Sequence, residues 1–405
     1  MIKGDIHKVN INGNKTEKIK ISFGFNKNLN DEFVQMFYEN WAALSENFYD
    51  ENYHGVDWNK MKYRYQQYLP YIRNRENLRT LQTDMLGELN GSHLDFRTKG
   101  KEQKTFYKTK SIETGILFED ENPYKVKGFV SKSPIDILDN PIRPGDILVA
   151  VNGKEVNTDK NRNQYFTATS MSDEIVLSFK HRMRKYDVKI HPIDSRKVSD
   201  LLYDEWIMSK QKMVDKASDK RVAYVYMKNM GKKSLENFII DMTTEAIHKD
   251  ALILDLRYNR GGNVHDDVLQ FLSQVPYMKW KFRDGTLTSQ PNFTPAAKPI
   301  VLLINEHSLS DAEVTAEGFK QLKLGKIIGT ETYRWIIFTS ARGLVDGSYT
   351  RLPVWGCYKL NGDDLEKTGV APDIYVRNTF MNRLNDTDPQ LEKAIMEVMK
   401  QLDSK

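Results

Sequence analysis

Alternating strands and helices in the second half of the chain restrict its fold most strongly. Three apolar runs, VAYVYM, ALILDLRY and PIVLLIN, are typical of buried strands. Segments with helical character follow them at residues 234–248, from Val264 and from Asp311. This alternation predicts an α/β layer, with ligands at the carboxyl ends of the strands. We therefore expect residues 193–405 to form an α/β domain.

Residues 30–100 show a helical period instead. Their large apolar side chains recur three or four positions apart, after an asparagine that can cap a helix. The positions are Phe33, Phe37, Trp41, Leu44 and Phe48, followed by Leu78, Leu81, Met85 and Leu89. We expect a helical domain whose last helix leads into the sequence LNGSH.

Residues 1–29 contain two alternating stretches around Asn12-Gly13, a dipeptide typical of β-hairpins. Such a hairpin is too small to fold alone, so we interpret it as the remnant of a preceding module. On that interpretation Met1 need not be the native start. The lack of an apolar signal-peptide core near Met1 then leaves the location open between the cytoplasm and the periplasm or another extracytoplasmic space.

Residues 105–192 contain a series of short strand-like segments: TGILFE, VKGFVSKSPI, RPGDILVAVNGKEV, EIVLSFK and YDVKIHPI. This part resembles a PDZ domain, most specifically in PGDILVAVNG, where Pro144-Gly145-Asp146 turns into a strand that ends at Asn152-Gly153. The resemblance implies that extended peptides bind by strand addition, with TGILFE at the loop that holds the peptide carboxylate. A generic β-hairpin is the alternative.

Charge and cysteine content exclude several classes of protein. The 405 residues carry a formal net charge of +5, from 60 basic and 55 acidic residues, without a long block of one sign. We therefore expect no nucleic-acid partner, and we interpret the basic residues 180–185 as the solvated side of a strand. The single cysteine, Cys357, excludes an intramolecular disulfide and a cysteine-cluster metal site. No apolar run is long enough to span a membrane.

Two junctions between a strand and a helix carry candidate chemistry. In LDLRYNRGGN, the backbone N–H groups of Gly261 and Gly262 follow a buried strand and could bind an oxyanion, although helix entry turns also need glycine for steric reasons. In NEHSLSDAE, the Ser310 hydroxyl and the Asp311 N–H lie at a positively polarised helix start. Taken alone, a serine at this position is more often a helix N-cap than a nucleophile, because serine is a preferred N-cap residue.

Five motifs connect these junctions to a known family. GELNGSHLDFR, LDLRYNRGGN, NEHSLSDAE, GTETYRW and LEKTGVAPDIYV occur in the order found in the tricorn-like branch of the S41 serine peptidases. The resemblance covers nearly the whole chain. It implies a multidomain protein of mixed α/β and α+β class: a helical bundle, a PDZ domain and a peptidase domain with the crotonase-like ββα fold. It also implies catalysis without a metal or other cofactor.

The resemblance implies a role for each catalytic position. Ser310 would be the nucleophile, His93 the general base, and Glu366 the carboxylate behind it, with Ser92 as a relay between His93 and Glu366. The N–H group of one of the two glycines, together with that of Asp311, would bind the oxyanion. These roles agree with general chemistry, because a serine hydroxyl needs a base to remove its proton and that base needs an orienting partner.

The chain departs from its relatives in two ways. Trp335 stands where the other S41 branch has a catalytic lysine, which argues against a Ser/Lys dyad. The sequence TYRWIIF also lacks the glycines that usually follow this tryptophan in the tricorn-like branch, so we expect a narrower or differently shaped substrate pocket. Tricorn-type proteins carry β-propellers ahead of the helical domain; we expect a catalytic fragment or a shortened relative without them.

The expected function is that of a serine endopeptidase or oligopeptidase, which cleaves peptides or unfolded polypeptides through an acyl-enzyme. Two alternatives stay open: a non-catalytic peptide-binding PDZ scaffold, and a carrier of a small apolar ligand. Assembly into a homo-oligomer is common in the family and is compatible with either activity.

Overall fold

The computed structural model describes residues 6–10, 13, 15–22, 24, 26–99 and 110–404. The chain divides into two compact units, and each is described here by itself. The first comprises Met1–Glu102 and Phe338–Trp355; the second comprises Gln103–Ile337 and Gly356–Lys405. Strands β1 (His7–Asn10) and β2 (Lys15–Lys18) pair antiparallel, as the hairpin prediction requires, whereas Asn12 lies outside the described residues.

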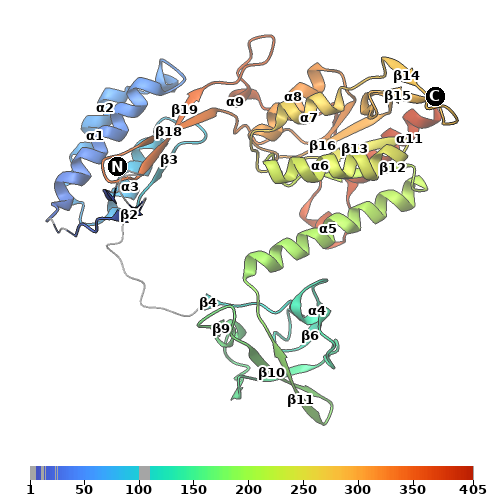
Figure 1. Ribbon diagram of the computed structural model, residues 1–405, viewed down its shortest axis with the longest axis horizontal. Helices are drawn as coiled ribbons and strands as arrows, with labels where there is room; N and C mark the ends of the chain where they lie inside the picture. Colours follow the sequence, from blue (N-terminus) through green and yellow to red (C-terminus); the bar gives the residue numbers. More distant parts are fainter. Residues whose placement is uncertain are drawn as a thin grey trace. The chain divides into compact units, whose positions relative to one another are not determined.

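The first unit combines three helices with a three-stranded antiparallel sheet. The helices are α1 (Leu29–Asn47), α2 (Trp58–Gln66) and α3 (Arg75–Gly87), and the sheet has the order β18 (Phe338–Gly343), β19 (Tyr349–Trp355) and β3 (Asp95–Arg97). Side chains such as Phe37, Leu78 and Met85 form its core. Figure 1 draws the orange strands β18 and β19 in this unit with the blue helices. No local period in the sequence predicts that residues 338–355 join this unit.

A β-rich segment with its own hydrophobic core begins the second unit. Its main sheet has the order β11-β10-β7-β8, and β5 pairs with β6. Its strands are β4 (Lys110–Ser111), β5 (Ile116–Phe118), β6 (Val126–Phe129), β7 (Ile147–Val151), β8 (Lys154–Glu155), β9 (Thr167–Ala168), β10 (Ile175–His181) and β11 (Arg184–Ile190); helix α4 is Pro134–Ile137. The basic residues 180–185 are exposed where β10 turns into β11.

A five-stranded parallel sheet forms the rest of the second unit, in the order β12-β13-β16-β17-β20. The strands are β12 (Val222–Tyr226), β13 (Ala251–Asp255), β16 (Ile300–Ile304), β17 (Lys326–Gly329) and β20 (Ile374–Tyr375). The principal helices are α5 (Ser195–Ser218), α6 (Lys232–Thr244), α7 (His265–Leu272), α8 (Asp311–Gln321) and α11 (Pro389–Asp403). Smaller elements are β14 (Met278–Trp280), β15 (Thr288–Gln290), α9 (Leu365–Thr368) and α10 (Phe380–Leu384).

Both faces of this sheet are covered by helices, which explains why its strands are continuous apolar runs. In β13, Leu252 and Leu254 belong to a core with α6, α7 and α8, whereas Ile253 belongs to a core with α5 and α11. Figure 1 shows α8 and α5 on opposite sides of the strands. The predicted α/β layer is therefore present, and the mixed α/β class is confirmed.

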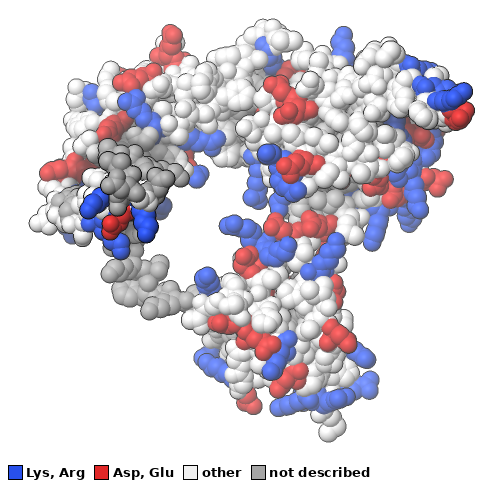
Figure 2. Space-filling model, in the orientation of Figure 1, with Lys and Arg blue, Asp and Glu red and all other residues white. Residues whose placement is uncertain are grey.

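The surface agrees with the mixed charge of the sequence. On the face shown in Figure 2, Lys and Arg side chains are interspersed with Asp and Glu, without a large area of one sign. Within the described ranges, no helix has both the length and the apolar character needed to cross a membrane.

Candidate active site

Ser310 lies at the junction between β16 and α8, at the carboxyl end of the central sheet. Its φ of 57° and ψ of −121° lie outside the regions that non-glycine residues ordinarily occupy. Such a conformation costs about 1 to 3 kcal/mol and persists only when the surroundings hold it. A sharp, strained turn from strand to helix is also the geometry that presents a nucleophilic serine in α/β-hydrolases.

The turn before Ser310 is held by the segment that follows β13. The buried Ser308 donates from Oγ to the Leu256 carbonyl (2.8 Å) and accepts from the Asn305 N–H (3.0 Å). The Leu309 N–H donates to the Asn259 carbonyl at 3.0 Å. Ser308 therefore has a structural role, and of the two serines in this turn Ser310 is the candidate nucleophile.

The two glycines are required by close contacts of their backbones. A Cβ atom at Gly261, whose φ is +74°, would lie 2.5 Å from the Cβ of Ser310. A Cβ at Gly262 would lie 2.0 Å from the carbonyl oxygen of Met230. Both distances are far below van der Waals contact. Steric crowding alone therefore accounts for a glycine at each position. The same contact also places Gly261 directly against Ser310.

The N–H groups around Ser310 differ in their hydrogen bonds. The Gly261 N–H donates to Asn259 Oδ1 at 2.9 Å. Within the described part of the chain, the N–H groups of Gly262 and Asp311 have no acceptor. Two unpaired amides therefore follow the two junctions, one after Gly261 and one after Ser310.

The Asp311 carboxylate connects the two helices that begin at these junctions. It is buried and accepts from the Val264 N–H (2.7 Å), the His265 N–H (3.1 Å) and His265 Nδ1 (2.5 Å) at the start of α7. The hydrogen bond to Asp311 raises the pKa of His265, against the effect of burial. Asp311 thereby positions α7 relative to α8 while its own N–H stays unpaired.

Glu366 lies in α9 of the same unit and is hydrogen-bonded to the loop that contacts α8. The Ile336 N–H donates to Glu366 Oε2 at 2.9 Å, and the preceding N–H, that of Trp335, donates to Glu313 Oε1 at 2.8 Å. The consecutive N–H groups of Trp335 and Ile336 thus donate to two different carboxylates, those of Glu313 and Glu366. This arrangement connects Glu366 to the Ser310 helix through one short loop.

Ser92 and His93 belong to the first unit, between α3 and β3. His93 is buried, with 6% of its surface exposed, and has a φ of 62°. Ser92 is partly buried. Ser92 and His93 thus belong to a different unit from Ser310. Among the described residues, no group of three or more His, Cys, Asp or Glu side chains could hold a metal ion.

Sequence reasoning missed two residues of this site. Asn259 accepts from the Gly261 N–H through Oδ1 and donates to the Met227 carbonyl at 2.7 Å, which fixes the glycine turn. Glu313 accepts from the Ser310 N–H at 3.0 Å. The spacing Ser-x-x-Glu at the start of a helix could have identified Glu313, since it is typical of a capping box.

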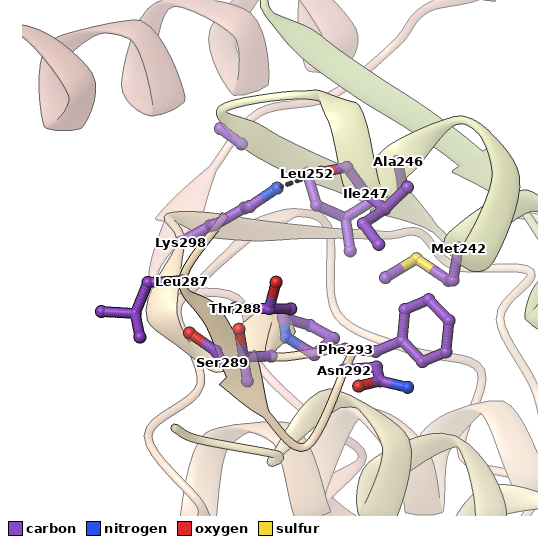
Figure 3. A pocket seen from close by; sticks show the side chains of 13 residues that line it. Met242, Ala246, Ile247, Leu252, Leu287, Thr288, Ser289, Asn292, Phe293 and Lys298 are labelled. Carbon is purple, nitrogen blue, oxygen red and sulfur yellow. Dashed lines mark hydrogen bonds between the residues drawn. The ribbon is translucent and has the colours of Figure 1, made fainter. Parts of the chain in front are cut away.

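The second unit also contains a cavity of about 310 Å³ that lies away from Ser310. It is lined by residues at the amino ends of the strands, such as Ala251 and Leu252, together with Met242, Phe293 and Lys298. Figure 3 shows Met242 and Phe293 on one side and Lys298 on the other, where Lys298 Nζ donates to the Ile247 carbonyl at 2.8 Å. Because Ser310 follows the carboxyl end of β16, this cavity is not the candidate active site.

Comparison with known proteins finds two matching family models and several similar sequences. Residues 221–376 match the family model of peptidase family S41, and residues 29–87 match that of the tricorn protease C1 domain. The tricorn protease of Thermoplasma volcanium is 27% identical over 395 residues, 93% of this chain and 37% of that protein. A tricorn protease homolog of Saccharolobus solfataricus is 27% identical over 387 residues, 92% of this chain and 35% of that protein.

A solved structure, described as the crystal structure of the tricorn protease, shares the fold. It has a TM-score of 0.82 and 23% sequence identity, and the match covers 99% of this chain and 40% of that chain. This chain spans less than half the length of these relatives. Residues 221–376 are thus similar to peptidase family S41, and nearly the whole chain is similar to part of the tricorn proteases.

Proposed function

We propose that this chain is a serine peptidase that hydrolyses peptide bonds through an acyl-enzyme. The observation that carries the proposal is the strained Ser310 at a junction of strand and helix, packed against Gly261, where the N–H groups of Gly262 and Asp311 have no acceptor among the described residues. Sequence similarity adds support, because the tricorn proteases it resembles are named for proteolysis. Peptides or unfolded polypeptides are the proposed substrates, and both endopeptidase and oligopeptidase activity fit the site.

In the proposed mechanism, His93 removes the proton from Ser310 Oγ as that oxygen attacks the scissile carbonyl carbon. The carbonyl oxygen becomes an oxyanion, which two backbone N–H groups bind. His93 then gives its proton to the leaving amine when the C–N bond breaks. A water molecule, deprotonated by His93, then attacks the ester carbon, and His93 returns that proton to Ser310 Oγ as the ester C–O bond breaks and the carboxylate product leaves.

For the oxyanion site we propose Gly262 and Asp311. The N–H of Gly261 is engaged by Asn259, whereas those of the two proposed residues are unpaired within the described chain and can donate to a developing charge. A preorganised donor of this kind contributes about 3 to 4 kcal/mol to the stabilisation of the transition state.

For the proton-handling side we propose that Ser92 relays between His93 and Glu366. A carboxylate behind the base keeps the imidazole in the required tautomer and stabilises its protonated form. Glu366 is held at Oε2 by the Ile336 N–H, so its position is set by the same loop that contacts α8. The proposal requires the first unit to bring His93 to the carboxyl edge of the sheet that holds Ser310.

We further propose that residues 105–192 form a PDZ domain that captures peptides, that residues 30–100 form a helical domain, and that residues 193–405, apart from 338–355 of the first unit, form a peptidase domain. Antiparallel strands around a separate core support this assignment. Within the TGILFE segment, Ile116–Phe118 form β5 directly after Gly115, which has a φ of 86°. An exposed strand edge in such a domain can accept an extended peptide as an added strand.

Substitution Ser310→Ala tests the activity. We expect it to lower kcat/KM on a fluorogenic peptide library by at least about 10³-fold, because the nucleophile is lost and only binding and oxyanion stabilisation remain. A fluorophosphonate should label the wild-type chain at Ser310 and leave the variant unlabelled. Ser172→Ala, at an exposed serine of the β-rich segment, serves as the control and should leave both readouts unchanged.

The same experiment separates the alternatives. A peptide-binding scaffold or a ligand carrier would bind its ligand without turnover and would not react with the fluorophosphonate. Peptide hydrolysis that persists in the Ser310→Ala variant would reject Ser310 as the nucleophile.

A further inference from the structure

Glu313 is a buried carboxylate for which the proposed mechanism has no role. It lies one turn into α8, three residues after Ser310, and 0% of its surface is exposed. Burial alone is unfavourable for a carboxylate, and it raises the pKa of Glu313 although four hydrogen bonds oppose the shift. A buried carboxylate needs partners for its oxygens, so the identity of these partners indicates what it does.

Each oxygen of Glu313 accepts two hydrogen bonds. Oε1 accepts from the N–H groups of Ser310 (3.0 Å) and Trp335 (2.8 Å). Oε2 accepts from the N–H of Arg334 (2.9 Å) and from Thr332 Oγ1 (2.6 Å). An ionised carboxylate has about four acceptor positions, so these four donors use all of them.

Only one of the four bonds belongs to a helix cap. The bond from the Ser310 N–H is the one that a capping-box glutamate makes, and such a bond stabilises a helix end. The other three come from residues 332–335, which lie outside the helix. A capping function alone therefore does not account for the arrangement.

The three loop bonds connect the nucleophile to the segment that carries Glu366. The N–H next to Trp335, that of Ile336, donates to Glu366 Oε2 at 2.9 Å. Thr332 Oγ1, which donates to Glu313, accepts in turn from the Val370 N–H at 2.9 Å, just beyond α9. The Glu313 carboxylate thus lies at the centre of a network that joins α8, the 332–336 loop and the α9 segment.

We propose that Glu313 is a positioning residue, whose carboxylate holds the strained backbone of Ser310 and fixes the loop to which Glu366 is hydrogen-bonded. It touches neither substrate nor reacting atoms and acts through these two residues. This inference rests on the proposed peptidase function. On this proposal, the Glu313 carboxylate sets the positions of Ser310 and Glu366 relative to each other.

The variant Glu313→Gln tests the proposal sharply. Glutamine has nearly the same volume and is itself a capping-box residue, so a purely capping role predicts almost normal behaviour. However, the NH₂ group of this glutamine would replace one carboxylate oxygen, and an NH₂ group cannot accept the two hydrogen bonds that this oxygen accepted. Either oxygen accepts at least one bond from residues 332–335, so at least one loop bond is lost. The matched control is Glu317→Gln, one turn further along α8, where the carboxylate meets Gln321 at an exposed position.

We expect Glu313→Gln to lower kcat by about 10- to 100-fold with KM changed less than about twofold, because misplacement of reacting groups affects the chemical step. The second-order rate of fluorophosphonate labelling at Ser310 should fall by a similar factor, since it reports the reactivity of the serine without peptide binding. Circular dichroism should show an unchanged fold, and Glu317→Gln should match the wild type. Normal kcat and labelling in folded Glu313→Gln would overturn the proposal.

A second pair of variants covers the case in which Glu313→Gln does not fold. Thr332→Val removes one donor to Glu313 and leaves the carboxylate in place; we expect labelling to slow by about threefold or more, with Thr332→Ser restoring it to within about twofold. Wild-type labelling rates in Thr332→Val would contradict the inference. A wild-type chain that neither cleaves peptides nor reacts with the probe would instead reject the proposed function itself.

Discussion

At the residue scale, the site depends on contacts that leave no room for a side chain. Gly261 packs against Ser310, and Gly262 packs against the backbone of Met230. These contacts bring the two junctions together, and among the described residues the N–H groups of Gly262 and Asp311 have no acceptor. Ser310 adopts its strained conformation among these neighbours, with its N–H held by Glu313. The chemistry of the site is thus a consequence of close backbone approach.

The variant Gly261→Ala tests this view. Its methyl group would lie 2.5 Å from the Cβ of Ser310, and its φ of +74° is unfavourable for alanine. We expect fluorophosphonate labelling to fall at least about tenfold and stability to fall by about 1 to 3 kcal/mol, as for other strained positions. Gly128→Ala in β6, where no atom lies within 4 Å of the added Cβ, is the control and should label normally. Normal labelling of Gly261→Ala would show that the approach of the two turns is not needed.

At the element scale, a buried ionic network joins the carboxyl end of β13, the interior of α5 and the start of α11. Arg257 follows β13 and donates from Nη1 to Asp388 Oδ1 at 2.7 Å, and Lys210 of α5 lies 3.3 Å from Asp388 Oδ2. Asp388 is also the N-cap of α11, where it accepts from the Leu391 N–H at 3.1 Å. One carboxylate therefore joins three elements at the edge of the sheet from which the glycine turn begins.

Acid should weaken this network in a defined window. Burial tends to raise the pKa of Asp388, but the charge of Arg257 and hydrogen bonds from Arg257 and Asn378 lower it to about 2. A lowered carboxyl pKa gives stability that is fully present above the unfolded-state value near 4 and is lost as the pH falls through about 2. We expect the free energy of unfolding, measured in urea, to show this loss between about pH 4 and 2.

Asp388→Asn should remove the same contribution at neutral pH. We expect it to cost about 3 kcal/mol, because Arg257 and Lys210 keep their charges while the partner loses its own. The stability difference from the wild type should then shrink as the pH falls toward 2. Asp403→Asn, at the other end of α11 where the side chain is 72% exposed, is the control and should change little. A difference that stays constant with pH would argue against this assignment.

At the scale of the whole molecule, the chain builds its first unit from two distant parts of the sequence. Strand β19 pairs with β3, so that Arg351 lies opposite Asp95, and Leu352 is buried in the core of α1 to α3. The helical part that carries His93 therefore depends on residues that follow Ser310 in the sequence.

Leu352→Ala should reveal this dependence. Truncation of a buried leucine typically costs about 2 to 5 kcal/mol, and here the loss falls on the first unit. We expect hydrogen exchange to become faster in α1 and α3, while amides of β13 and β16, which belong to other cores, keep their protection. Val345→Ala, at a residue that is 50% exposed, is the control. Equal loss of protection in both units would contradict the division of the cores.

Local patterns identified the elements of the fold and many of the candidate residues. The apolar runs of β12, β13 and β16 and the helical period of α1 and α3 could be predicted because they depend on neighbouring residues. The position of Ser310 between a strand and a helix followed from the same pattern. The similarity to tricorn proteases and to peptidase family S41 was predicted from the order of five motifs. The catalytic roles of His93, Ser92 and Glu366 stay predictions.

The sequence by itself determined which segments are buried and where their periods change, since side-chain direction along a strand or helix repeats every two or 3.6 residues. Only the tertiary structure decided that the Gly261 N–H donates to Asn259 Oδ1, whereas the Gly262 N–H has no acceptor among the described residues. It likewise decided that the Glu313 carboxylate accepts four hydrogen bonds, three of them from residues 332–335. It also decided that residues 338–355 complete the sheet of the first unit. These features depend on contacts between segments far apart in the chain, which no local period encodes.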